Sequence, residues 1–198
     1  MTATLDKADL RVRLRRARQE RSADERVAAA QGIAARVLAL PEVAAAATVT
    51  AYISRASEPG TTPLLRGLLD RGVRVLLPVL LEGLVLDWAT YTGDADLVAC
   101  ALPGNSSLLE PGGARLGPDG VATADVVLAP GLAVDVHGTR MGFGGGCYDR
   151  ALALVDATTP VAVLLHDEEV LDAVPREPHD RPVTMAVTPR RVVRFVDS

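Results

Sequence analysis

The sequence predicts an α/β sandwich with a largely parallel sheet, and three observations indicate it. Segments with the pattern of strands alternate with segments with the pattern of helices along the chain. Residues 73–77 form a near-continuous apolar run, as expected for a parallel strand buried on both faces, and residues 161–165 are interpreted as a second buried strand. The length of 198 residues suits one domain or two small ones and is ample for a core.

Two helices are expected at the start of the chain. Residues 6–21 place Leu10 and Leu14 on one face, with basic residues elsewhere, which is typical of an amphipathic helix. A capping box that begins at Ser22 opens a second helix. Pro41 is expected to end this helix, because proline cannot continue the helical hydrogen-bond pattern.

The next elements are expected to be strands and one helix. A strand over residues 48–53 precedes a helix that Thr62 caps and Gly72 ends in the C′ position. The buried strand at 73–77 follows, and residues 84–90 form another strand nearer an edge of the sheet.

The C-terminal half begins with a segment dense in proline and glycine. This composition over residues 103–120 predicts a long surface loop. The remaining elements are expected to be strands at 126–130, 161–165, 183–187 and 192–195, a helix at 148–155 and a polar connection at 175–182.

Composition excludes several classes of protein. A net charge of −4 and only 3% aromatic residues argue against nucleic-acid binding. No apolar run is long enough to span a bilayer, and the N-terminus is charged where a signal peptide needs an apolar stretch. Cys100 and Cys147 are too few for a disulfide framework, and the three histidines lack metal-ligand spacing. We expect a cytoplasmic, monomeric enzyme that acts on small molecules, without a membrane or a nucleic acid.

A glycine-dense loop between Arg140 and Asp149 is the strongest functional signal. Glycines can adopt φ > 0 and let successive backbone N–H groups converge on one concavity. A helix that begins at about Tyr148 would add its unpaired N–H groups and the positive end of its dipole. Such a loop is a site for phosphate. Arg140 supplies a guanidinium to it, and Asp149 is placed to hold Mg²⁺ beside the phosphates.

The loop does not fit the two common phosphate-binding motifs. No Gly-Lys-Ser/Thr closes it, which excludes a Walker A motif. Cys147 occupies the third glycine position of the dinucleotide fingerprint, and the preceding strand ends well before the loop begins. A plain surface turn is the remaining alternative, since glycine clusters often mark one.

Other polar residues admit two interpretations each. Lys7 and Arg11 lie four residues apart on one helix face, which suits a polyphosphate or a solvated basic surface. An RNA-binding role for this helix ranks last, because the rest of the chain is acidic. Glu58 follows a strand and could bind a polar heterocycle or be an exposed loop acid. Asp180 could pair with Arg181 or supply a second carboxylate for Mg²⁺.

Together these segments resemble the 5-formyltetrahydrofolate cyclo-ligase family, whose members are also called methenyltetrahydrofolate synthetases. The resemblance covers nearly the whole chain in the right order, and the glycine loop is its most specific part. The matching pieces are residues 7–11, 52–54 with Glu58 and Thr61, 76–78, 110–111, 127–132, 135–150 and 175–180.

The resemblance implies a single cyclo-ligase domain over residues 1–198. Its fold would be a three-layer α/β/α arrangement similar to that of ribose-5-phosphate isomerase and CoA transferases. The implied reaction is the ATP- and Mg²⁺-dependent cyclisation of 5-formyltetrahydrofolate to 5,10-methenyltetrahydrofolate, with release of ADP and phosphate. The formyl oxygen is phosphorylated, N10 attacks the formyl carbon, and phosphate leaves.

The resemblance also implies roles for particular residues. ATP is expected to contact Lys7, Arg11, Arg140, Met141, Gly142, Phe143, Gly144, Gly145, Gly146, Cys147 and Tyr148, with Arg140 and Lys7 as the catalytic residues. The folate substrate is expected at Ile53, Glu58, Phe143, Gly144, Gly145, Gly146 and Cys147, and Mg²⁺ at Asp149 and Asp180.

Three positions depart from the family pattern. Cys147 stands where the family generally has the first of two tyrosines, Val134 replaces a common phenylalanine, and Thr184 replaces an acid. The first two line or support the expected folate pocket. A non-catalytic paralogue that binds nucleotide or folate is therefore the alternative function.

Overall fold

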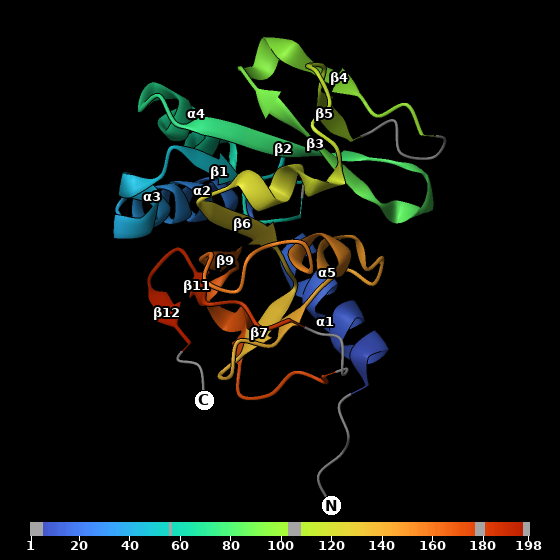
Figure 1. Ribbon diagram of the computed structural model, residues 1–198. Helices are drawn as coiled ribbons and strands as arrows, with labels where there is room; N and C mark the ends of the chain where they lie inside the picture. The colour runs from blue at the N-terminus through green and yellow to red at the C-terminus, as the bar shows by residue number, and fades with distance from the viewer. Residues whose placement is uncertain (1–5, 56, 103–107, 177–180, 196–198) are drawn as a thin grey trace, which may run out of the picture.

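A seven-stranded sheet forms the centre of the molecule (Figure 1). The computed structural model describes residues 6–55, 57–102, 108–176 and 181–195. The strand order is β12-β11-β9-β6-β1-β2-β3, and the five strands from β11 to β2 are parallel to one another. The edge strands β12 and β3 are antiparallel to their neighbours. The predicted, largely parallel sheet is confirmed, with the strand at 84–90 at an edge.

The helices and strands have the following bounds. The helices are α1 (Lys7–Gln19), α2 (Ala23–Leu38), α3 (Pro41–Ala45), α4 (Thr62–Asp70) and α5 (Cys147–Leu152). The strands of the large sheet are β1 (Thr48–Thr50), β2 (Arg74–Leu80), β3 (Leu86–Tyr91), β6 (Val126–Pro130), β9 (Val161–Leu164), β11 (Met185–Val187) and β12 (Val192–Arg194). The others are β4 (Leu97–Ala99), β5 (Leu109–Pro111), β7 (Ala133–Asp135), β8 (Arg140–Met141) and β10 (Val170–Leu171), with 3-10 turns η1 (Glu82–Leu84), η2 (Asp94–Asp96), η3 (Pro118–Thr123) and η4 (Asp167–Glu169).

Helices cover both faces of the large sheet, which gives the three layers. Successive residues of a strand point to opposite faces, so Val127 and Leu128 of β6 belong to two different cores. Leu128 packs in the core beneath α2 and α4, with Ile33 and Leu64. Val127 packs in the core on the other side, where Leu152 of α5 lies. The three-layer α/β/α architecture is therefore confirmed.

Helix α1 packs away from the large sheet, against the small sheet β10-β7-β8. Leu10 and Leu14 form one core with Leu132, Ala133 and Met141. The predicted apolar face of this helix is confirmed. Because Met141 immediately precedes the glycine loop, this packing places α1 directly beside the loop.

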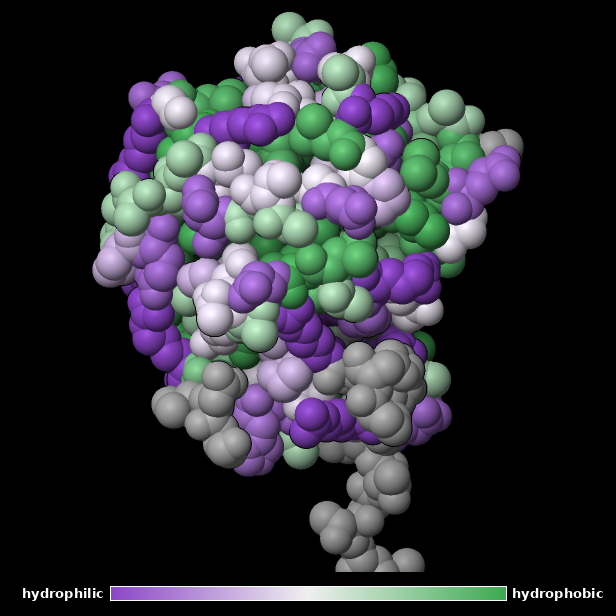
Figure 2. Space-filling view, viewed as in Figure 1, coloured by the Kyte–Doolittle hydropathy of each residue, from purple (hydrophilic) through white to green (hydrophobic). Residues whose placement is uncertain are grey.

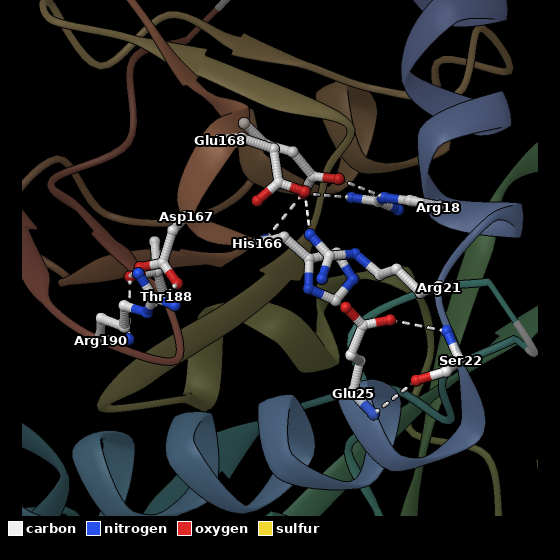
Figure 3. Close-up of polar contacts among 10 residues, drawn as sticks. Arg18, Arg21, Ser22, Glu25, His166, Asp167, Glu168, Thr188 and Arg190 are labelled. Carbon is white, nitrogen blue, oxygen red and sulfur yellow. Dashed lines mark hydrogen bonds and ion pairs between the residues drawn. The ribbon is translucent and has the colours of Figure 1, made fainter.

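A buried ion pair fixes the end of α1 (Figure 3). Arg18 and Glu169 are each 1% exposed, and the guanidinium donates to both carboxylate oxygens at 2.6 and 2.8 Å. Arg18 Nη2 also donates to the carbonyl of Gly131 at 2.6 Å. The backbone N–H of His166 donates to Glu169 at 2.8 Å, and burial lowers the pKa of the His166 imidazole to about 3. One cluster thus joins α1 to the turn that follows β9.

The helix starts follow the predicted capping rules. Asp6 accepts a hydrogen bond from the backbone N–H of Ala8, which satisfies one unpaired donor at the start of α1. The box at Ser22 is complete: its hydroxyl accepts from the N–H of Glu25, and its own N–H donates to the Glu25 carboxylate. Figure 3 shows these two residues facing one another.

Several boundaries differ from the sequence predictions. Pro41 begins the short helix α3 after α2 has ended, because proline is well tolerated in the first turn. The N-cap of α4 is Thr61 rather than Thr62. Strand β1 is shorter than residues 48–53, because the chain leaves the sheet after Thr50. Residues 103–120 are predicted to form one long loop, but they contain β5 and the start of η3, while residues 103–107 lie outside the described part. Within the described residues, no helix is long and apolar enough to cross a membrane.

Candidate active site

A cleft of about 540 Å³ opens where several parallel strands end. Its walls include Tyr52 after β1, Pro78 in β2 and Pro130 at the end of β6. The carboxyl ends of parallel strands are where ligands bind in open α/β sheets. The cleft is lined by Arg15, Gln19, Tyr52, Ile53, Arg55, Ser57, Glu58, Leu77, Pro78, Leu80, Leu84, Leu86, Leu108, Leu109, Glu110, Pro130, Arg140, Gly142, Phe143, Gly145, Gly146, Cys147, Tyr148 and Asp149.

The glycine loop, residues 142–146, forms one wall of the cleft. It runs from β8 to α5, and Gly144 and Gly146 have φ of +103° and +67°, as the sequence led us to expect. A Cβ at Gly142 would lie 2.9 Å from Nη1 of Arg140, so a side chain at this position would require that guanidinium to shift. The helix that follows begins at Cys147 and is six residues long.

Arg140 lies at the junction of the loop and the sheet. It is 5% exposed, yet its side chain lines the cleft. Nη1 donates to the carbonyl of Pro130 at 3.2 Å, and Nη2 forms an ion pair with Asp149. These bonds hold a guanidinium in a fixed orientation at the phosphate end predicted from the sequence.

The two expected metal ligands have different outcomes. Asp149 lines the cleft beside Arg140, whereas Asp180 lies outside the described residues. Elsewhere in the described chain, no group of three His, Cys, Asp or Glu side chains could hold a metal. Mg²⁺ usually takes one or two protein carboxylates together with phosphate oxygens and water. One carboxylate beside a loop that is predicted to bind phosphate fits that requirement.

Arginines of α1 dock onto the glycine loop. Arg11 Nε donates to the carbonyl of Gly142 at 3.1 Å, and Arg15 Nη2 donates to the carbonyl of Phe143 at 2.9 Å. The guanidinium carbons of Arg15 and Arg18 lie 5.9 and 5.8 Å from the centre of the Phe143 ring, within the range of a cation–π contact. The structure therefore brings Arg11 to the glycine loop, although its side chain is not part of the cleft lining.

Four expected ATP contacts lie outside the cleft lining, and Arg11, which bonds to the glycine loop from α1, is one of them. Lys7 is the first residue of α1, and the Met141 side chain is buried in the core with Leu10. Gly144 faces Arg11 instead: a Cβ there would lie 3.7 Å from its guanidinium carbon. The remaining expected residues, Ile53, Glu58, Arg140, Gly142, Phe143, Gly145, Gly146, Cys147, Tyr148 and Asp149, all line the cleft.

Glu58 and two tyrosines, Tyr52 and Tyr148, form a polar patch in the cleft. Burial raises the pKa of the Glu58 carboxyl, although its Oε2 accepts a hydrogen bond from the N–H of Arg55 at 2.8 Å. Burial and then the Glu58 charge raise the pKa values of both Tyr52 and Tyr148. Tyr148 also meets the edge of Trp88, with ring centres 6.4 Å apart. A carboxylate in this position can accept hydrogen bonds from a polar heterocycle.

The apolar end of the cleft was not predicted, and it adjoins the glycine loop at Leu84. Leucines of the β2–β3 hairpin and of the segment before β5 line it, and Leu84 at the hairpin tip is 46% exposed. Figure 2 shows green, apolar residues over this part of the surface. The N–H of Leu80 donates to the buried carboxylate of Glu110 at 2.8 Å, which ties the hairpin to β5.

Sequence reasoning missed Arg15, Gln19 and Tyr52 in the cleft. For the first two, a signal was present: Lys7, Arg11, Arg15 and Gln19 succeed one another at intervals of four residues on one helix face. Tyr52 lies next to the predicted substrate contact Ile53, but the short length of β1 was not foreseen.

Comparison with known proteins places this geometry in one family. Residues 3–189 match the 5-formyltetrahydrofolate cyclo-ligase family. The 5-formyltetrahydrofolate cyclo-ligase of Mycolicibacterium smegmatis is 43% identical over 149 residues, covering 73% of this chain and 74% of the relative. That of Escherichia coli K12 is 31% identical over 183 residues, covering 90% of this chain and 98% of the relative.

Two solved structures are similar as well. The NMR structure of Aquifex aeolicus 5,10-methenyltetrahydrofolate synthetase has a TM-score of 0.81 and 29% identity, covering 97% of this chain and 94% of its own. The 5,10-methenyltetrahydrofolate synthetase from Mycoplasma pneumoniae has a TM-score of 0.74, covering 94% of this chain and 100% of its own. At 18% identity, the second supports the fold alone.

Proposed function

This chain belongs to the 5-formyltetrahydrofolate cyclo-ligase family, and we propose that it cyclises 5-formyltetrahydrofolate to 5,10-methenyltetrahydrofolate with ATP and Mg²⁺. One observation carries the proposal: a single cleft combines an arginine- and glycine-lined end with an apolar end, and the Glu58 carboxyl lines the same cleft. A triphosphate suits the first end and a reduced folate the second. We further propose that residues 1–198 form a single domain. We still predict that the protein is monomeric and cytoplasmic.

The chemistry needs a better leaving group than the formyl oxygen. That oxygen attacks the γ-phosphorus of ATP, the bond to ADP breaks, and the formyl oxygen carries the phosphoryl group. N10 then attacks the formyl carbon, the carbon–oxygen bond breaks with loss of phosphate, and N10 gives up its proton. The products are 5,10-methenyltetrahydrofolate, ADP and phosphate. N10 is already adjacent to the formyl carbon, so the substrate supplies part of the required proximity.

The phosphate end is assigned to cations and backbone amides. Phosphoryl transfer depends on positioning and charge neutralisation more than on a protein nucleophile. Arg140, held by Pro130 and Asp149, would stabilise charge on the transferring group. Lys7 and Arg11 of α1, with the N–H groups of the glycine loop, would bind the remaining phosphates. Asp149, with Asp180, would hold Mg²⁺, which neutralises phosphate charge when bound.

The folate end is assigned to Ile53, Glu58 and the loop from Phe143 to Cys147. Burial raises the pKa of Glu58, so a hydrogen bond from a heterocycle N–H to its carboxylate would be stronger than in solvent. Cys147 lines the cleft where the family generally has a tyrosine, so its smaller side chain leaves more room on this wall. We expect this exchange to affect folate affinity more than nucleotide binding.

The decisive experiment follows the absorbance of 5,10-methenyltetrahydrofolate. Purified protein with 5-formyltetrahydrofolate, ATP and MgCl₂ should form the product, and omission of ATP should abolish it. Omission of Mg²⁺ in the presence of a chelator should lower the rate strongly. Nucleotide or folate binding without any product would instead identify a non-catalytic paralogue.

A further inference from the structure

Two walls of the cleft meet at one exposed side chain, Arg150. Its Nη2 donates to the carbonyl of Leu84 at the tip of the β2–β3 hairpin, at 2.6 Å. The same nitrogen donates to the carbonyl of Gly145 in the glycine loop, at 3.1 Å. Leu84 and Gly145 both line the cleft. A single guanidinium therefore joins the apolar wall to the phosphate-binding wall.

The backbone on both sides of this contact is unusual. Leu84 has a φ of +61° and is the one non-glycine residue in the described ranges with positive φ. Left-handed backbone is strained for leucine and persists only where its surroundings hold it. Arg150 bonds to the carbonyl of that same residue. Arg150 thus bonds to the hairpin at its strained residue, Leu84.

The loop side of the contact is equally close. A Cβ at Gly146 would lie 2.8 Å from Nη1 of Arg150, so the guanidinium lies directly against the loop backbone. A Cβ at Gly145 would lie 3.7 Å from Cδ1 of Leu84, so the walls are also near van der Waals contact. Asp149, the preceding residue, pairs with Arg140. Two consecutive residues of α5 therefore orient Arg140 and fix the hairpin.

We infer that Arg150 is a positioning residue of the cyclo-ligase reaction. By holding the hairpin tip against the glycine loop, it sets the separation between the apolar wall and the phosphate end. The inference rests on the proposed function, since phosphoryl transfer requires the formyl oxygen and the γ-phosphorus to approach within roughly 3–3.5 Å. Arg150 acts through the backbone of both walls and contacts neither reacting atom.

The test is Arg150→Gln with Arg71→Gln as the matched control. Arg71 is also exposed and also donates to a carbonyl of a distant segment, that of Leu38 at 2.5 Å, but it lies outside the cleft lining. We expect Arg150→Gln to lower kcat by about 10- to 100-fold, because a misplacement of about 1 Å costs on that order. The KM for ATP should change by less than about threefold, since ground-state nucleotide binding is left in place. Arg71→Gln should leave both unchanged.

Two further readouts separate positioning from a general loss of structure. Arg150→Lys, which keeps a donor but loses the planar fork, should recover part of the lost kcat. Amide hydrogen exchange over residues 81–86 should become faster in Arg150→Gln and stay unchanged in Arg71→Gln, because the hairpin tip loses its anchor.

Unchanged exchange at the hairpin would overturn the inference, and so would a wild-type kcat in Arg150→Gln. A fall in melting temperature that accounts for the whole loss of activity would also overturn it. A wild-type protein that forms no product would remove the proposed function instead. The exchange measurement would still decide whether Arg150 fixes the hairpin, because it needs no turnover.

Discussion

The two ends of the cleft hold their side chains by different physical means. At the glycine-loop end, Arg11, Arg15 and Arg140 donate hydrogen bonds to backbone carbonyls over 3.1, 2.9 and 3.2 Å. At the apolar end, residues such as Leu80 and Leu86 are held by packing against the core. Hydrogen bonds fix direction as well as distance, whereas packing tolerates changes that conserve volume. We therefore expect the first end to govern turnover and the second to govern substrate affinity.

The largest predicted effect is a loss of unfolding free energy when the anchor of α1 is removed. This helix supplies Arg11 and Arg15 to the glycine-loop end. Glu169→Gln keeps the shape of the side chain but leaves the buried charge of Arg18 without its counter-charge. Breaking a buried ion pair in this way costs about 3–5 kcal/mol of unfolding free energy. Urea denaturation measures this quantity directly.

The matched control for Glu169 is Glu20, the residue that caps the C-terminal end of α1. Glu20 pairs with Arg16 four residues before it, and the two side chains are 64% and 79% exposed. Glu20→Gln should cost less than about 1 kcal/mol, because exposed ion pairs are weak. Equal losses in the two variants would mean that the buried pair does not anchor α1.

The next effect tests turnover at the polar end. Arg140→Ala should lower kcat by roughly 10²-fold or more, by analogy with the loss of a group that stabilises transition-state charge. The control is Arg115→Ala, since Arg115 also donates to a proline carbonyl, Pro111 O at 3.5 Å, but lies outside the cleft lining. Steady-state kinetics on the folded variants measures the effect. Near-normal turnover of Arg140→Ala would remove this residue from the mechanism.

A smaller effect tests affinity at the apolar end. Leu80→Ala should raise the KM for 5-formyltetrahydrofolate about tenfold, because apolar contact worth about 1–2 kcal/mol is lost. The KM for ATP should stay unchanged. Leu116→Ala, at an exposed leucine outside the cleft lining, serves as the control. Equal changes in both KM values would show that the apolar end does not bind 5-formyltetrahydrofolate selectively.

The two ends also differ in how far the sequence predicts them. The glycine-loop end is built largely from one contiguous segment, so local pattern alone predicted that glycines of this loop, Arg140 and Asp149 form one site. Alternation of strands and helices likewise predicted the largely parallel sheet, whereas the antiparallel pairing of β3 was not predicted. These features depend on residues close together in the chain.

The apolar end depends on contacts between distant segments, and no local pattern encodes them. Leu109 belongs to β5, which pairs with β4, and it lines the cleft. It lies within residues 103–120, whose proline and glycine content predicted only a loop. The burial of Arg18 was also missed, because its partner Glu169 lies far away in the sequence. A basic residue on an amphipathic helix is usually solvated, so only the tertiary structure reveals the exception.

The smallest predicted effect is a change in the pH dependence of stability, and it concerns Glu58 in the cleft. Burial raises the pKa of Glu58 above the value of 4.5 expected for an exposed glutamate, so its charged form is less favourable in the folded protein. Its contribution to stability is therefore fully present below the unfolded pKa and is lost as pH rises through the folded pKa. Glu58→Gln should gain unfolding free energy relative to the wild type over that window, while its KM for 5-formyltetrahydrofolate rises.

Glu25 provides a control of opposite sign for this pH dependence. The hydrogen bonds from Ser22 in the capping box lower its pKa, so its contribution to stability is present above the unfolded pKa and is lost as pH falls through the folded pKa. Glu25→Gln should therefore lose stability relative to the wild type as pH rises, where Glu58→Gln gains it. Urea denaturation over a pH series compares the two variants. If the stability difference from the wild type changes with pH in the same direction for both variants, the folded protein does not disfavour the charged form of Glu58. The strong hydrogen bond proposed for its carboxylate would then have no physical basis.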